Sequence, residues 1–237
     1  MIEKEWLTSA DPVLLMRGLR DRISQRKCDL FELTCAERMS TDWLDPIFHE
    51  YLHFISRVVE GHNPKSDESV WATDPVGELA QSLWYGTQSL FAERTGLDQT
   101  VYDAVRRYVA VALLNGVHGE LRWWDWLTDV RPVAVPTTPD EAADSILFGI
   151  FRDHLPLLRC IVGNPFRPVA CDPSWRTSTA VGLADAIYSE RSFDRLPILA
   201  DALEEAGCTH PDVLAHCRGD GPHARGCWVV DLILGKS

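Results

Sequence analysis

Apolar residues recur three and four positions apart along most of this chain, and that spacing constrains its fold more than any other feature. In residues 24–39, for example, Cys28, Phe31, Cys35 and Met39 fall on one stripe of a helix. No stretch alternates between apolar and polar residues over the length of a strand, and residues 133–136 are too few to do so. The sequence therefore predicts an all-α protein.

Residues that begin and end helices divide the chain further. Helices are expected at about 9–19, 24–39, 42–59, 74–96, 98–116, 120–130, 138–162, 179–190, 193–206, 211–217 and 223–234. Residues 163–178 hold three prolines and are expected to be irregular. We therefore predict a bundle-like helical N-terminal region, 1–162, and a compact helical C-terminal module, 163–237.

Composition narrows the class of protein. Of the 237 residues, 46% are hydrophobic and 24% are charged, so the chain can bury a core. Its formal charge of -12 repels phosphate backbones and argues against nucleic acid as a partner. No apolar run approaches the roughly 18 residues that cross a bilayer, and the charged start is unlike a signal peptide. We therefore expect no membrane partner and a cytoplasmic location.

The cysteines are expected to be reduced. Their number, seven, is odd, and no export signal is evident. Reduced thiols in a reducing compartment are small buried side chains or metal ligands rather than disulfides.

One candidate site for chemistry is the sequence HEYLH. His49 and His53 would lie one turn apart on a helix and could share a zinc, with Glu50 placed to activate a metal-bound water. A third ligand at the spacing typical of zinc proteases is missing. A metal site of a helical bundle, in which His118 or His154 joins the two histidines, is the alternative.

A second candidate is a cluster near the C-terminus that spans twenty residues. Its members are Cys208, His216, Cys217, His223 and Cys227. His223 and Cys227 are four apart and would share a helix face, while the turn at 218–222 would bring the preceding helix back toward them. Such a set could form a tetrahedral zinc site with nitrogen and sulfur ligands. Alternatively, the cysteines are small core residues and the histidines satisfy helix ends.

Two other groups of side chains have possible functional roles. Cys217 or Cys227 could be a nucleophile paired with His216 or His223, although the sequence shows no third orienting residue. The three tryptophans within 123–126 could form a ligand platform, but interior packing or a partner-binding patch explains them more simply. No phosphate-binding glycine loop or dinucleotide fingerprint is present.

The last third of the chain resembles a known family. The stretches GNPFRPVACDPSW at 163–175, AIYSERSFDRLPILADALEEAGC at 186–208 and LAHCRGDGPHARGCWVVDLILGK at 214–236 are similar to a conserved C-terminal block in a large paralogous family of uncharacterised bacterial proteins. Members open with a segment like Glu5-Trp6-Leu7 and carry a variable, helix-rich middle. Residues 195–207 are also similar to the core of the short repeat-companion domain.

The resemblance implies an interaction or scaffold module, since a variable middle and a constant tail suit that role. It places HEYLH in the variable part and the Cys/His cluster inside the constant block. The leading prediction is a non-enzymatic module that binds another protein through its tryptophan-rich or C-terminal surface. The rival prediction is a zinc protein, with either a structural zinc in the C-terminal cluster or a catalytic zinc at HEYLH. No other cofactor is predicted.

Overall fold

The computed structural model describes residues 1–39 and 136–236 and isolated positions between them, and these residues form helices without any strand. The isolated positions are 52, 53, 56, 57, 59–61, 81–83, 85, 88, 103 and 109. The predicted all-α class is therefore confirmed. Among the described helices, none is both long and apolar enough to cross a membrane.

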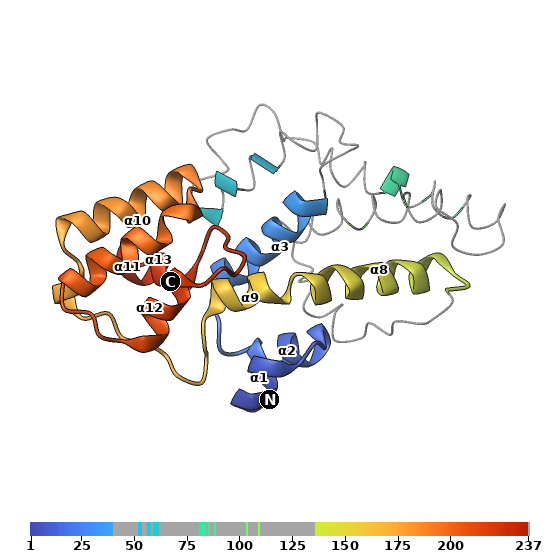
Figure 1. Ribbon diagram of the computed structural model, residues 1–237. Coiled ribbons are helices and arrows are strands. Elements are labelled where there is room, and N and C mark those ends of the chain that lie inside the picture. The colour runs from blue at the N-terminus through green and yellow to red at the C-terminus, as the bar shows by residue number, and fades with distance from the viewer. Residues whose placement is uncertain are drawn as a thin grey trace.

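The first group of helices comes from both ends of the N-terminal region (Figure 1). It comprises α1 (Glu3–Thr8), α2 (Pro12–Leu19), α3 (Gln25–Met39), α8 (Pro139–Asp153) and α9 (Leu155–Val162). The Asp11 carboxylate caps α2 by accepting a hydrogen bond from the Leu14 N–H. Thr138 and Glu141 form a capping box at the start of α8. These helix starts follow directly from the sequence.

The prediction of one continuous helix at 138–162 was wrong, because the chain breaks at His154. His154 adopts φ −102° and ψ 6°, and α9 then begins afresh at Leu155. In a continuous helix, the ring of Pro156 would clash with the carbonyl of Arg152 and remove a hydrogen bond. After the break, α9 runs on toward the C-terminal module (Figure 1).

The first core lies between α2, α3, α8 and α9. Phe31 and Phe151 are fully buried in it, with ring centroids 5.6 Å apart. Trp6 on α1 is also buried, and its indole N–H donates to the Gly163 carbonyl at 3.1 Å. That hydrogen bond fixes the start of the irregular segment to the first helix.

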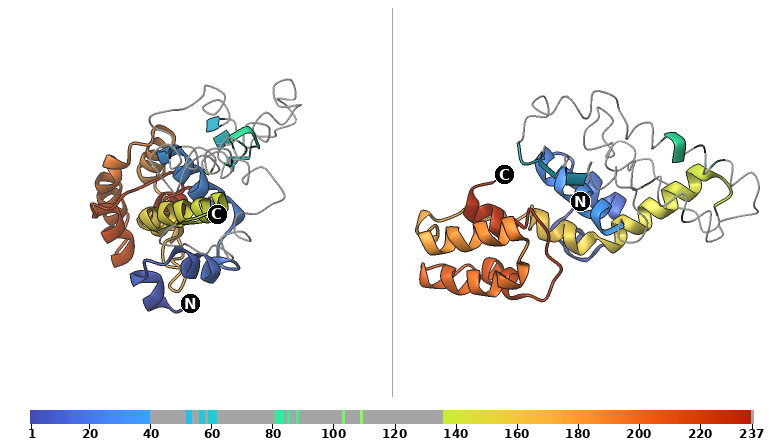
Figure 2. Two further views of the ribbon diagram at one scale, coloured as in Figure 1. Left: turned by 90° about the vertical axis from the view of Figure 1, so that its right-hand side faces the viewer. Right: turned by 90° about the horizontal axis from the view of Figure 1, so that it is seen from above.

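The second group of helices belongs to the C-terminal module and has a core of its own (Figure 2). It comprises η2 (Pro173–Trp175), α10 (Ser178–Glu190), η3 (Phe193–Arg195), α11 (Leu196–Glu205), α12 (Pro211–Arg218) and α13 (Trp228–Leu234). Apart from the short η2, residues 163–177 are irregular, as expected from their prolines. Ile187, Leu199, Leu203 and Ile233 are fully buried in this core.

The predicted helix at 223–234 was wrong in its first turn, because α13 begins only at Trp228. Residues 219–227 form a loop instead, and Gly226 within it adopts φ +88°. A Cβ at Gly226 would lie 2.7 Å from Leu30 on α3. The position therefore needs glycine for both its backbone angle and its close contact.

A buried ion pair joins α3 to α13. Asp231 is 2% exposed and accepts from Arg26 Nη1 at 2.8 Å and from Lys27. Lys27 Nζ also donates to the Gly226 carbonyl at 2.6 Å. The loop before α13 is thus held from the side of the N-terminal region.

Candidate metal centre

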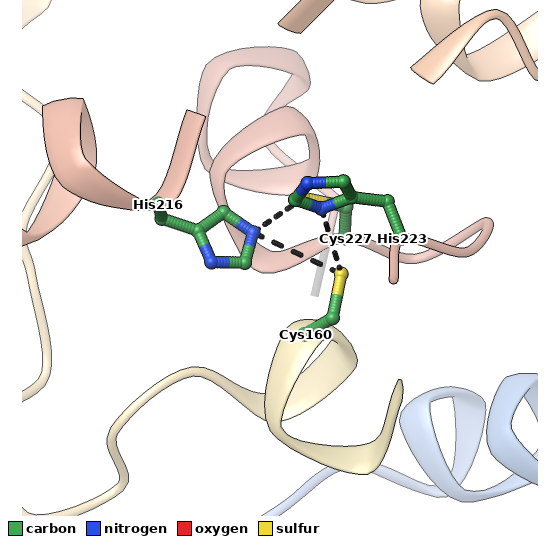
Figure 3. A group of neighbouring side chains, drawn as sticks. All are labelled: Cys160, His216, His223 and Cys227. Atoms are coloured by element: carbon green, nitrogen blue, oxygen red, sulfur yellow. Dashed lines mark hydrogen bonds between the residues drawn. The ribbon is translucent and has the colours of Figure 1, made fainter. Parts of the chain in front are cut away.

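Four side chains from three elements converge where α9 meets the C-terminal module. Cys160 comes from α9, His216 from α12, and His223 and Cys227 from the loop before α13 (Figure 3). One potential ligand atom of each lies within 4.8 Å of all the others. Separate elements therefore deliver two sulfurs and two nitrogens to one point.

The distances between these atoms are close to the edges of a metal tetrahedron. Cys160 Sγ lies 3.4 Å from His223 Nδ1 and 3.8 Å from His216 Nε2, and His216 Nε2 lies 3.1 Å from Cys227 Sγ. With Zn–N near 2.05 Å and Zn–S near 2.3 Å, ideal edges are about 3.4 Å to 3.8 Å. The widest separation in the group is up to 4.8 Å, so zinc would need to draw these side chains together by up to about 1 Å.

The pKa values of the two thiols, Cys160 and Cys227, shift in opposite directions. Burial opposes ionisation of Cys227, but hydrogen bonds from Cys160, His216 and His223 outweigh it and lower the pKa of Cys227 well below its usual range. For Cys160, the hydrogen bond to Cys227 and burial of the side chain raise the thiol pKa well above its usual range. A bound cation would stabilise both sulfurs as thiolates.

Aromatic rings surround the two histidines. The His216 ring meets the His223 ring nearly edge to face at 5.0 Å, and the Trp228 ring lies 5.4 Å from the His216 ring. Phe193 stacks near His223 with ring centroids 6.4 Å apart. Packing of this kind limits the rotamers of the histidines and so fixes where their nitrogens point.

The structure brings together three of the five predicted cluster residues: His216, His223 and Cys227. Cys208 and Cys217 are each 1% exposed, lie in the second core and are not members of the converging group. Burial raises the pKa of Cys217, as expected of a thiol packed among apolar side chains. The surroundings of these two cysteines match the alternative prediction, in which they are small core residues rather than metal ligands.

Cys160 was missed by the sequence analysis. It lies 56 residues before His216, on the other side of the predicted boundary at 163, so no local spacing connects it to the cluster. His223 and Cys227 were expected on one helix face, yet both lie on the loop.

Most of the HEYLH candidate lies outside the described residues. This holds for His49, Glu50 and His118, and also for the tryptophans within 123–126. His53 is described and exposed, and His154 Nδ1 lies 2.6 Å from the Ile150 carbonyl oxygen. Neither belongs to a metal-binding group among the described residues.

A nucleophilic role fits Cys227 less well than a ligand role. Its sulfur sits beside His216, but the residue has no exposed surface, and Cys217 has almost none. A substrate carbonyl could not reach either thiol without opening the core. By contrast, the four potential ligand atoms lie within 4.8 Å of one another, as a metal site requires.

Comparison of the chain with protein-family models, curated proteins and solved structures finds no match. The resemblance of the last third to a bacterial family stays a prediction, and the function has to be argued from the site.

Proposed function

We propose that this chain is a zinc-binding protein in which Cys160, His216, His223 and Cys227 hold one structural zinc ion. The observation that carries the proposal is the convergence of their four ligand atoms within 4.8 Å. Two thiolates and two imidazoles in a tetrahedron are the donor set that favours zinc over harder cations such as magnesium or calcium.

The arrangement suits a structural metal better than a catalytic one. Four protein ligands complete a tetrahedral zinc sphere, whereas catalytic zinc keeps one position for water or substrate. Cys160 and Cys227 are 3% and 0% exposed, so the metal would lie away from solvent on the sulfur side. The expected role is to hold α9 against α12 and the loop before α13.

A cytoplasmic location and a non-enzymatic scaffold role are parts of this proposal. Zinc-bound thiolates require a reducing compartment, and all seven cysteines are free thiols. A metal that joins the C-terminal module to the N-terminal helices would give an interaction module a rigid frame. The protein partner itself stays a prediction from the sequence.

Elemental mass spectrometry of the purified protein tests the proposal. We expect about one zinc per chain in the wild type and none in Cys160→Ser, because three remaining ligands hold zinc far less tightly. Cys208→Ser is the matched control, since Cys208 is equally buried but outside the cluster. It should keep its zinc, and so should His53→Ala.

Two results would overturn the proposal. One is wild-type protein purified without chelator that contains no zinc and takes none up. The other is loss of zinc in His53→Ala together with its retention in Cys160→Ser, which would move the metal to HEYLH.

A further inference from the structure

A second site, separate from the four metal ligands, is a pocket of about 280 Å³. Its lining comes from the start of α3 and the residues just before it, from the irregular segment after α9, and from the C-terminal module. The apolar part of the wall includes Ile23, Pro165, Pro168, Val169, Trp228 and Leu232. This volume is at the small end of the range for small-molecule sites, so the pocket suits a ligand of few atoms.

Most charged side chains of the wall already have partners of opposite charge. The ion pairs are Lys27 with Asp231, Arg167 with Glu3 and Lys236 with Glu60. Each pair neutralises its own members and leaves little charge for a ligand. Two wall residues remain, Arg22 and Asp212, and neither forms an ion pair within the described part of the chain. The pocket therefore offers one cation and one anion.

The cation, Arg22, is positioned by an aromatic ring rather than by a carboxylate. Its guanidinium lies 4.8 Å from the centre of the Phe166 ring. Contact with a ring face uses the plane of the guanidinium and leaves the N–H groups at its edge to donate. The Phe166 backbone N–H donates to Asn164 Oδ1 at 3.0 Å, which holds this part of the segment. The Arg22 side chain is exposed, so a carboxylate can reach its N–H groups.

The anion, Asp212, lies in the first turn of α12. The N-terminal end of a helix favours a negative charge, so the carboxylate stays ionised there without a cationic partner. Its side chain is exposed, and it accepts no hydrogen bond from the residues that the structure describes. Both oxygens can therefore accept from an ammonium group of a ligand.

The apolar wall between the irregular segment and α13 is fixed by close contacts. Gly163 adopts φ +72°, and a Cβ there would lie 2.9 Å from Cγ of Trp228. The next residue, Asn164, donates from Nδ2 to Glu3 at 2.8 Å. These contacts order the wall before a ligand arrives, and an ordered site loses less entropy on binding.

We infer that this pocket binds a free α-amino acid with an apolar side chain, with Arg22 at its carboxylate and Asp212 at its ammonium group. Such a molecule carries one charge of each sign beside one apolar group, which matches the open cation, the open anion and the apolar remainder of the wall. A ligand with two negative charges would lack a second open cation. The inference does not depend on the proposed zinc, because none of the four metal ligands lines the pocket.

Isothermal titration calorimetry of the full chain with L-leucine and with L-phenylalanine tests the inference. We expect saturable binding of at least one of them, weakened about tenfold or more in Arg22→Gln and in Asp212→Asn, since a hydrogen bond to a charged group contributes that much. Both variants change exposed side chains and should fold. Arg152→Gln and Asp201→Asn are the matched controls, because these exposed residues pair elsewhere and do not line the pocket.

Two analogues of leucine separate the contributions of the two charges. Leucinamide lacks the carboxylate and N-acetyl-leucine lacks the ammonium group, so each should bind about tenfold more weakly than leucine or worse. The inference is wrong if the wild type binds neither amino acid, or if binding is unchanged in Arg22→Gln or Asp212→Asn. An equal loss in the control variants, or N-acetyl-leucine that binds as tightly as leucine, also overturns it.

Discussion

The two cores of this molecule treat buried polar groups in opposite ways. In the first core, Glu32 on α3 is 1% exposed, and neither of its carboxylate oxygens accepts a hydrogen bond from the described part of the chain. Burial, with a smaller contribution from the charge of Asp29, raises its pKa well above the usual value. In the second core, the polar groups of Cys160, His216, His223 and Cys227 face one another.

The difference between the lone buried carboxyl group of Glu32 and the converging Cys/His group bears on which of the two could bind a ligand. A solitary buried carboxyl group can be neutral simply by keeping its proton. Four groups with lone pairs aimed at one point repel one another unless protons or a cation lie between them. The second arrangement is the one on which the zinc proposal rests.

We expect the largest loss of stability when the proposed zinc is removed from the second core. We expect a tight chelator to lower the free energy of unfolding of the zinc-loaded protein by about 5 kcal/mol, because metal binding contributes directly to folding. For a chain of this size, that corresponds to a fall in Tm of roughly 10–20 °C in a thermal scan.

Cys227→Ala supplies the control for that experiment. The variant should have the lower Tm from the start and should not respond to the chelator. If wild-type protein that contains zinc kept its Tm in chelator, the metal would not hold the core together, and the contrast between the two cores would fail.

The next effect concerns the ion pair at the junction of the two cores. Asp231→Asn should lower the free energy of unfolding by about 3 kcal/mol, because Lys27 would be left buried without its carboxylate and Arg26 would keep only Glu60, at 3.6 Å. Urea denaturation measures the change. Asp201→Asn is the control, since Asp201 forms an exposed pair with Arg218, and it should cost less than about 1 kcal/mol.

The smallest effect tests the solitary carboxyl group of the first core. Glu32→Met should raise the free energy of unfolding by about 1–2 kcal/mol at pH 8, since methionine fills similar space without an unpaired polar group. The unfolded carboxyl ionises near its ordinary pKa of 4.5, whereas the folded one stays protonated to a higher pH. The wild type therefore loses stability as pH rises above that value.

It follows that the advantage of Glu32→Met should be small at pH 4 and should grow toward pH 8. Urea denaturation across that range follows it. A variant that is less stable than the wild type at every pH would show that the Glu32 carboxyl stabilises the first core after all.

Much of the local structure could be predicted because its causes are local. Apolar spacing placed α3 and α10 to within a residue or two, and Thr138 marked a real helix start. The errors came where one residue overrides a pattern. Pro156 divides the helix expected at 138–162, and Gly226 lies in a loop that contacts α3 where a helix was expected.

The candidate site was predicted in part for the same reason. His216, His223 and Cys227 are close in sequence, so their spacing drew attention to them. Cys208 and Cys217 lie in the same short stretch of sequence as these three residues, but their side chains pack into the second core. Which face of a helix or loop a cysteine occupies depends on the packing partners, and spacing alone does not report it.

By itself, the sequence of this protein determined the all-α class, the irregular segment after Gly163 and the presence of a Cys/His-rich tail. These properties follow from residue periodicity, from proline and from composition. Only the tertiary structure decided that Cys160 joins the tail residues, and that Arg22 and Asp212 line one pocket. Convergence of distant residues depends on how helices pack, and many packings satisfy the same local rules.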